Sequence, residues 1–320
     1  MTRVGVLEGT GLVGRELRDQ LEARPQLHAE LSLWTQREEG AGALTEIGGA
    51  AAIVQRLQPE DLEGLDLLMV CDPRADEIAL LRRIPETLGV IVVSPVVEIP
   101  GGCPLIAERI VEPPRRGEIL VSPHPAVVGL AHLLLPLEEL GLEEVVATVL
   151  LPASMIDQEA LEEMFAQTRA LLEFKTPAAT DRFPHQIAFN LLPASADDSI
   201  LVWQLGALLR SRPRIAASSL QAGVFHGVSI SAFCRLASDV GLDEVTAALD
   251  ENPRVELAET PDAVGPVAAA SGDTVLLAEV RPAPGVPGGF WLWAALGNLT
   301  RGGASNAVGI AERLLAGSAD

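Results

Sequence analysis

The sequence predicts an α/β protein in which a doubly wound parallel sheet is followed by a second domain of the α+β type. Over about the first 120 residues, short apolar segments alternate with helical patterns, which is typical of a parallel sheet covered by helices on both faces. From Glu143 onward the apolar segments are longer and the helices between them fewer. That change favours a mixed or largely antiparallel second sheet.

The elements of the first domain follow from apolar runs and the residues that flank them. The expected strands are Arg3–Leu7, Leu31–Trp34, Leu67–Cys71, Val90–Ser94 and Ile119–Val121. The expected helices are Val13–Leu21, Ala75–Ile84 and a longer one from about Ala126 to Leu140. Because several of these strands are apolar at successive positions, we expect both faces of the sheet to be buried.

The second domain is expected to contain five longer strands and few helices. The strands are Val145–Leu151, Ile215–Val224, Val228–Leu236, Thr274–Val280 and Phe290–Leu296, and the helices are Asp157–Leu172 and Asp243–Leu249. We expect the helix Asp157–Leu172 to cover one face of this sheet. The strands are too apolar to leave the other face in water, so a symmetric partner is expected to cover it.

Charge and cysteine content narrow the class of protein. The chain of 320 residues has a net charge of −21, which argues against binding nucleic acid or an anionic membrane. The three cysteines, Cys71, Cys103 and Cys234, are an odd number and favour free thiols in a reducing compartment. No signal peptide fits before Arg3, no apolar run has the length of a membrane span, and no residue cluster has the spacing of a metal site. We therefore expect a cytoplasmic protein without a metal.

A glycine-rich turn is the first candidate binding site. Gly9, Gly11 and Gly14 form the pattern G-x-G-x-x-G directly between an expected strand and helix. That context is typical of a Rossmann-type domain, where the backbone approaches the pyrophosphate of a dinucleotide. The candidate cofactor-binding residues here are Gly9, Thr10, Gly11, Leu12, Val13 and Gly14. A turn that only joins strand and helix is the other interpretation, and both remain open.

Three segments resemble the aspartate-semialdehyde dehydrogenase family. The first is the glycine-rich turn, and the second is His185–Pro193, which reads HQIAFNLLP. The third is Gly297–Val308, which reads GNLTRGGASNAV where the family has a motif close to DNLRKGAAGNAV. Their order and spacing fit along nearly the whole chain.

The resemblance implies a domain organisation and further site residues. It implies an NAD(P)-binding domain of residues 1–122 and 303–320, completed by a helix at Ala304–Leu315, and a dimerisation and substrate domain of residues 123–302. Arg37 falls where the family often places an arginine beside the 2′-phosphate of NADP, and Asn298 lies in the closing motif. Both are therefore candidate cofactor-binding residues.

The family's nucleophile and base are both replaced in this sequence. The family forms a thioacyl enzyme through a cysteine in a segment reading SNPNCST, and the matching segment VSPHPAVV has Ala126 at the cysteine position, or Pro125 if the register shifts by one. Ser122 is more simply a helix N-cap and His124 a loop residue than substitutes for the thiol. The histidine position falls on Val228. His226, two residues earlier and on the same expected strand face, is more simply a structural histidine.

Other segments that contact ligands in the family also differ. The resemblance places Glu98 where the family has an arginine that binds an anion, and the segment SGAG reads Ser154–Asp157, without its glycines. Glu8 replaces the first glycine of the family's GATGAVG turn, where a carboxylate is expected to face and repel the cofactor phosphates. NADP binding is therefore expected to be weak or absent.

These departures lead to two functional interpretations and to no predicted catalytic residue. The first is a homologue without the phosphorylating dehydrogenase activity, similar to the Usg-type branch that lacks the thiol. It would act as a binding or partner protein, either a homodimer or a subunit paired with an active paralogue. The alternative is an NAD(P)-dependent oxidoreductase with an altered substrate and mechanism in the same crevice.

Overall fold

The computed structural model describes residues 2–27, 29–177, 181–195, 197–237 and 239–316. The chain divides into two compact units, Met1–His124 with Gly302–Asp320, and Pro125–Arg301. Residues 317–320, which the sequence assigned to the first domain, lie outside the described residues. None of the described helices has the length and apolar character needed to cross a membrane.

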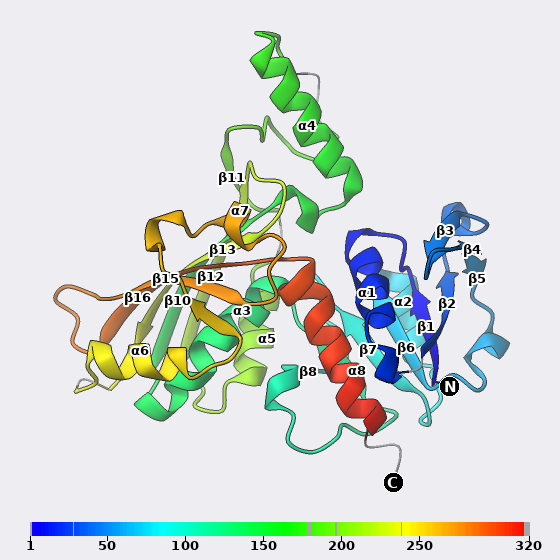
Figure 1. The fold of residues 1–320 in the computed structure, drawn as a ribbon, viewed down its shortest axis with the longest axis horizontal. Coiled ribbons are helices and arrows are strands. Elements are labelled where there is room, and N and C mark those ends of the chain that lie inside the picture. Colours follow the sequence, from blue (N-terminus) through cyan, green and yellow to red (C-terminus); the bar gives the residue numbers. More distant parts are fainter. Residues whose placement is uncertain (1, 28, 178–180, 196, 238, 317–320) are drawn as a thin grey trace. The chain divides into compact units, whose positions relative to one another are not determined.

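The first unit is built on a seven-stranded parallel sheet (Figure 1). In spatial order the strands are β5 (Gln55–Arg56), β2 (Ala29–Thr35), β1 (Thr2–Leu7), β6 (Leu67–Cys71), β7 (Gly89–Val93), β9 (Ile119–Ser122) and β8 (Gly102–Pro104). Because β2 and β6 lie on opposite sides of β1, the strand order reverses there. The carboxyl ends of β1 and β6 therefore form the crevice in which doubly wound sheets bind ligands.

Helices cover both faces of this sheet, as the apolar strands predicted. On one face α1 (Leu12–Glu22) and α8 (Asn306–Ala316) pack on Val6, Met69 and Ile91. On the other face α2 (Ala75–Leu81) and the 3₁₀ turn η3 (Pro59–Leu62) pack on Leu68, Val70 and Val92. All residues of β6 and β7 are buried, which confirms the doubly wound arrangement.

A small hairpin in this unit was not predicted from the sequence. It consists of β3 (Leu44–Ile47) and β4 (Ala50–Ile53), joined by Gly48 and Gly49 with φ of 56° and 76°. Such φ values favour glycine, which explains the tight turn. Three further 3₁₀ turns are η1 (Pro25–Leu27), η2 (Glu38–Gly40) and η4 (Ala107–Arg109).

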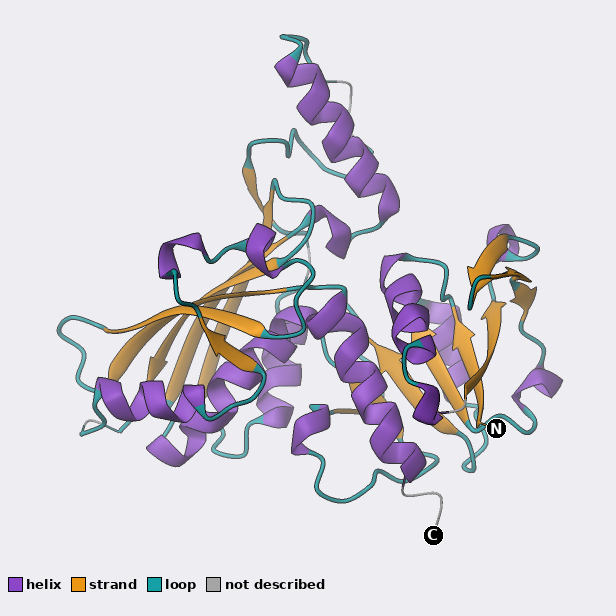
Figure 2. Cartoon of the chain, in the orientation of Figure 1, coloured by secondary structure: helices purple, strands orange, loops and turns teal. Residues whose placement is uncertain are grey.

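The second unit contains a mixed seven-stranded sheet, which confirms the predicted α+β class (Figure 2). The order is β11 (Leu191–Pro193), β12 (Arg214–Ala222), β10 (Glu144–Leu151), β13 (Val228–Arg235), β16 (Gly289–Leu296), β15 (Val275–Pro282) and β14 (Val255–Leu257). The pairs β10–β12 and β14–β15 are parallel and the others antiparallel.

Three helices lie against one face of this sheet. They are α3 (Pro125–Leu134), which contacts β13, α5 (Ser199–Leu208), which contacts β12, and α6 (Leu242–Asp250), which contacts β15. The expected single helix over 126–140 is wrong. The α-helix ends at Leu134, and the 3₁₀ segment η5 (Leu135–Leu140) follows because Pro136 cannot donate the next helical hydrogen bond.

The helix α4 (Gln158–Leu172) does not cover the sheet as expected. Its buried residues Ala160 and Met164 pack instead in a separate cluster with Phe183 and Ile187. Asp157 caps it by accepting a hydrogen bond from the backbone N–H of Ala160 at 2.8 Å. The remaining elements are the 3₁₀ turns η6 (Ala153–Met155) and η7 (Pro261–Ala263), the short helix α7 (Pro266–Ala269) and the π-helical turn η8 (Thr300–Ser305), so the last α-helix starts at Asn306 rather than Ala304.

Candidate functional site

The glycine-rich turn joins β1 to α1, as predicted, and its glycines have different physical roles. A Cβ on Gly14 would lie 2.5 Å from the carbonyl carbon of Gly9, so the turn cannot close on a larger residue there. A Cβ on Gly11 would meet no atom within 4 Å. Packing therefore requires Gly14, whereas the absence of a side chain on Gly11 leaves backbone open to a ligand.

The N-terminus of α1 is suited to an anion. Gly11 is its N-cap and supplies no side-chain acceptor, and the first turn, Leu12–Gly14, holds no acidic residue. The first N–H groups of a helix lack partners within the helix, and the helix dipole adds positive potential there. A phosphate at this position would satisfy both.

Glu8 does not face the turn as expected from the sequence. It has a φ of 56°, the left-handed conformation that a glycine would adopt at that point without strain. Its buried carboxylate accepts hydrogen bonds from Thr35 Oγ1 at 2.9 Å and from the backbone N–H of Gln36 at 2.8 Å. The side chain is therefore bound to the carboxyl end of β2. Burial raises the pKa of Glu8, while these hydrogen bonds and the charge of Arg37 oppose the rise.

Arg37 lies beside Glu8 and is surrounded by carboxylates. Its Nε is 3.5 Å from both Glu8 Oε2 and Glu77 Oε1, and a terminal nitrogen donates to Asp72 Oδ2 at 2.9 Å. The other terminal nitrogen donates to the carbonyl oxygen of Asp72 at 2.7 Å. One guanidinium faces three carboxylates, so this cluster at the crevice is net negative. We call these four residues the Arg37 cluster.

Strained backbone marks the same edge of the sheet. Glu8, Asp72 and Ser94 directly follow β1, β6 and β7, and their φ angles are 56°, 41° and 49°. Non-glycine residues rarely adopt such angles, and they concentrate at functional sites. Three neighbouring strands therefore end in the same unusual conformation at the crevice.

The position that the family resemblance assigns to the thiol carries a buried methyl group. Ala126 lies in the first turn of α3 with 0% of its surface exposed. Ser122 is not an N-cap as expected, because it is the last residue of β9, and its hydroxyl accepts a hydrogen bond from Asn306 Nδ2 at 3.0 Å. His124 directly precedes α3, and complete burial lowers its pKa to about 4. Its imidazole is therefore neutral at pH 7.

The resemblance assigns the position of the family's base to Val228, which is the first residue of β13 and is also fully buried. His226 is not on the same strand face, contrary to expectation. Gly227, between them, has a φ of 87°, which breaks the two-residue period, and His226 lies in the turn before the strand. Its Nδ1 is buried and has no hydrogen-bond partner in the described part of the chain.

Asn298 holds two loops of the second unit together. Its Oδ1 accepts a hydrogen bond from the backbone N–H of Gly227 at 2.9 Å, and its Nδ2 donates to Ser154 Oγ at 3.0 Å. The side chains of Asn298 and Ser154 are both buried. This structural use of Asn298 was missed in the sequence because Ser154, Gly227 and Asn298 are far apart along the chain. Glu98, which the resemblance places at the position of a cationic residue of the family, is exposed.

The thiols and possible metal ligands add no second centre. Cys71 and Cys234 are buried and Cys103 is exposed. Burial raises the pKa of Cys71 to about 12, so its thiol is protonated and unreactive at neutral pH. Over the residues described, no group of three or more His, Cys, Asp or Glu side chains is arranged to hold a metal ion.

Comparison with known proteins gives a consistent result. Residues 134–301 match the model of the semialdehyde dehydrogenase dimerisation domain. The chain is 24% identical to an aspartate-semialdehyde dehydrogenase of Aquifex aeolicus over 98% of both chains. It is 32% identical to a USG-1 protein homolog of Azotobacter vinelandii over 61% of this chain and 62% of that protein. A probable aspartate-semialdehyde dehydrogenase structure from Pseudomonas aeruginosa superposes with a TM-score of 0.84, at 27% identity over 98% of both chains.

Proposed function

We propose that this chain, which belongs to the semialdehyde dehydrogenase family, has kept the family's fold but does not catalyse its phosphorylating dehydrogenase reaction. It works instead as a dimeric binding or partner protein. This proposal rests on the site residues that differ from the family pattern, while the residues that build the two sheets keep it.

The observation that carries the proposal is the pair Ala126 and Val228. Both are 0% exposed, and both occupy positions where the family resemblance calls for a reacting side chain. A methyl group cannot attack a carbonyl carbon, and an isopropyl group cannot transfer a proton. Loss of a nucleophile alone costs on the order of 10⁶ in rate in a well-studied hydrolase. Ser122 and His124 are buried, and Ser122 is hydrogen-bonded to Asn306, which argues against either as a replacement.

An activity assay tests this directly. We expect no reduction of NADP when the purified protein is mixed with aspartate semialdehyde and phosphate. The matched control is a Ser122→Ala preparation, in which any contaminating activity stays the same. Turnover that scales with protein concentration, survives repurification and falls in the Ser122→Ala protein would contradict the proposal.

The crevice at the carboxyl ends of β1 and β6 has two parts, the glycine-rich turn and the Arg37 cluster, which differ in how well they fit a dinucleotide. The open backbone at Gly11 and the uncapped start of α1 suit a pyrophosphate. The Arg37 cluster does not suit the 2′-phosphate of NADP, because the guanidinium is already bound by Glu8 and Asp72. A further dianion would enter a net negative, partly buried site. We therefore propose that NADP binds weakly or not at all, and less tightly than NAD.

Calorimetric titration with NAD and NADP tests the cofactor proposal. The variant Glu8→Gly removes one carboxylate from Arg37 and the strained φ, so NADP affinity should rise about tenfold. The control is Glu39→Gly, since Glu39 lies two residues after Arg37 in η2 and makes no ion pair with Arg37. If Glu8→Gly leaves NADP affinity unchanged while Gly11→Ala abolishes it, the turn binds cofactor without Arg37.

One observation favours the alternative, an NAD(P)-dependent oxidoreductase of altered mechanism. Packing does not require a glycine at position 11, yet Gly11 stands where a bound pyrophosphate would need a bare backbone. Tight binding of either dinucleotide in the same titration would support this function over a purely structural role.

The dimer is proposed from the second unit. Ala216, Val146, Phe233 and Trp291 lie side by side across β12, β10, β13 and β16, on the face opposite α3, α5 and α6. Val146 is 43% exposed in the single chain. A second copy, or an active paralogue with a similar face, would cover this apolar row and bury upward of roughly 2,000 Å², as obligate dimers do.

A further inference from the structure

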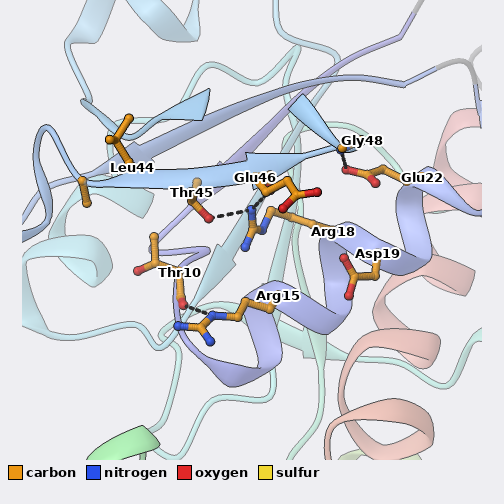
Figure 3. Close-up of a pocket in the computed structure, with 11 residues that line it drawn as sticks. Thr10, Arg15, Arg18, Asp19, Glu22, Leu44, Thr45, Glu46 and Gly48 are labelled. Carbon is orange, nitrogen blue, oxygen red and sulfur yellow. Dashed lines mark hydrogen bonds between the residues drawn. The ribbon is translucent and has the colours of Figure 1, made fainter. Parts of the chain in front are cut away.

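A pocket of about 600 Å³ lies along the flank of α1, between that helix and the β3–β4 hairpin (Figure 3). Thr10 lines it from the glycine-rich turn, Arg15, Arg18, Asp19 and Glu22 from α1, and Thr45 and Glu46 from the hairpin. Its volume falls within the roughly 300–1,000 Å³ of small-molecule sites. None of the residues of the Arg37 cluster lines it, so it is separate from the position expected for a 2′-phosphate.

Arg18 is the central group of this pocket. Only 4% of the residue is exposed, although its guanidinium carries a full charge. One terminal nitrogen donates to Thr45 Oγ1 at 3.2 Å and to the carbonyl oxygen of Glu46, both neutral acceptors. Its Nε is buried without a hydrogen-bond partner in the described chain. Burying a charge whose hydrogen bonds go only to neutral acceptors is costly, so an anionic group bound directly to the guanidinium would be stabilising.

Arg15 adds a second cation one turn earlier on the same helix. Its Nε donates to the carbonyl oxygen of Thr10 at 3.0 Å. Figure 3 shows the guanidinium groups of Arg15 and Arg18 on the hairpin side of α1. Residues three apart on a helix are neighbours, so the two guanidinium groups repel each other, and Arg15 also lies near the positive end of the helix dipole. An anion between them would remove that conflict.

Several other arginines of the first unit form ion pairs with carboxylates, unlike Arg15 and Arg18. Arg24, Arg37, Arg56 and Arg116 each lie within 4 Å of a carboxylate oxygen. Across the residues described, Arg15 and Arg18 have no such partner; the exposed arginines Arg3, Arg82, Arg83, Arg109 and Arg115 lack one too, but Arg18 is buried. The missing counter-charge is best supplied by a ligand.

The far end of the pocket has the opposite character. Asp19 and Glu22 follow on the same side of α1, and one Glu22 oxygen accepts a hydrogen bond from the backbone N–H of Gly48. Carboxylates accept hydrogen bonds from hydroxyl and amino groups and repel anions. A ligand that fits both ends is anionic at one end only and carries donors at the other.

We propose that this pocket binds a phosphate monoester of a small hydroxyl-bearing or amino-bearing molecule. Its phosphate lies between Arg15 and Arg18, and its donors reach Asp19 and Glu22. Two guanidinium groups give the charge-assisted hydrogen bonds that phosphate oxygens prefer. The proposal does not depend on cofactor binding at the glycine crevice.

Calorimetry on the full chain with ribose 5-phosphate and with inorganic phosphate tests this site. We expect ribose 5-phosphate to bind more tightly than inorganic phosphate, and Arg15→Gln to weaken it at least tenfold. Arg18→Lys keeps the charge but loses the planar group, and should weaken binding while circular dichroism remains unchanged. The control is Arg24→Gln, because Arg24 follows the C-cap of the same helix and lies outside the pocket, and it should change affinity less than twofold.

Three outcomes would overturn the proposal. They are the absence of ribose 5-phosphate binding at millimolar concentration, equal affinity for both probes, and affinity unaffected by Arg15→Gln and Arg18→Lys. Competition with NAD would assign the phosphate to the dinucleotide site instead. Since NAD binding is measured separately, loss of this site and loss of the cofactor site can be told apart.

Discussion

The two sheets of this protein cover their apolar faces in different ways. In the first unit, β6 and β7 are buried at every residue because helices lie on both faces. In the second unit, burial alternates along β10, with Val145 and Val149 buried and Val146 exposed. The first sheet therefore completes its own core within one chain. The second leaves an apolar row that only another surface can cover.

This difference assigns separate tasks to the two sheets. A sheet that is covered on both faces offers ligands only the ends of its strands, where Gly11 and the Arg37 cluster lie. A sheet with one open face offers a broad surface suited to a second protein. The first unit is thus the place to look for small-molecule binding, and the second for assembly.

The largest effect on stability is expected for a substitution in the core of the first unit, which is covered by helices on both faces of its sheet. Met69, in the centre of β6, is fully buried between strands and helices. We expect Met69→Ala to lower the free energy of unfolding by about 2–5 kcal/mol, since it removes apolar contacts and leaves a cavity. Urea denaturation measures this. Val111→Ala, at a residue that is 89% exposed, should change stability by less than about 0.5 kcal/mol. Equal effects of the two variants would contradict a closed core.

The next effect is a pH dependence that comes from His124 in the first unit. Its pKa is about 4 in the folded chain and 6.5 for an ordinary histidine. The unfolded chain therefore takes up a proton that the folded chain excludes, and the contribution of His124 to stability is complete above pH 6.5 and falls as pH drops toward 4. Each pKa unit corresponds to about 1.4 kcal/mol, so the loss is on the order of 3 kcal/mol.

The variant His124→Gln isolates this contribution. Its unfolding free energy should depend less on pH between 6.5 and 4 than that of the original protein. The same slope in both proteins would show that other groups cause the acid sensitivity.

A smaller effect, at least tenfold in the dissociation constant, is expected at the open face of the second sheet. Val146→Arg places a charge in the row formed with Phe233 and Trp291, where it would be desolvated on association. Sedimentation at micromolar concentration should give about twice 33.7 kDa for the original chain and a larger monomer fraction for the variant. Val111→Arg, on the exposed surface of the other unit, should not change the mass. An original chain that stays monomeric on tenfold concentration would exclude the dimer.

The local pattern of apolar and polar residues was sufficient to predict most of the long strands and helices. Leu67–Cys71 was predicted with its observed bounds because a run of five apolar residues between polar ones has few alternatives to a buried strand. Among the elements that were missed, the β3–β4 hairpin and the helix α5 were missed for opposite reasons. The β3–β4 hairpin is short and largely exposed, with little apolar alternation to detect. The helix α5 is apolar on nearly every side, so it shows no helical period.

The candidate site was predicted less completely than the fold. The sequence located the glycine turn, because that inference depends on residue type between a strand and a helix. The assignment of Ala126 and Val228 to the family's reacting positions stays a prediction. The sequence misjudged His226, since one left-handed glycine, Gly227, changes the side on which the preceding residue lies. It also did not indicate that Asn298 bonds to Ser154, because nothing local connects residues that are 144 positions apart.

The sequence by itself determined the fold class and the glycine turn at the end of β1. Each follows from residue type and local period. Only the tertiary structure decided that the Glu8 carboxylate binds Thr35 and Arg37, and that Arg18 meets Thr45 across a pocket. These contacts join segments about 27 residues apart. Their energies depend on burial and distance, which exist only once the chain has folded.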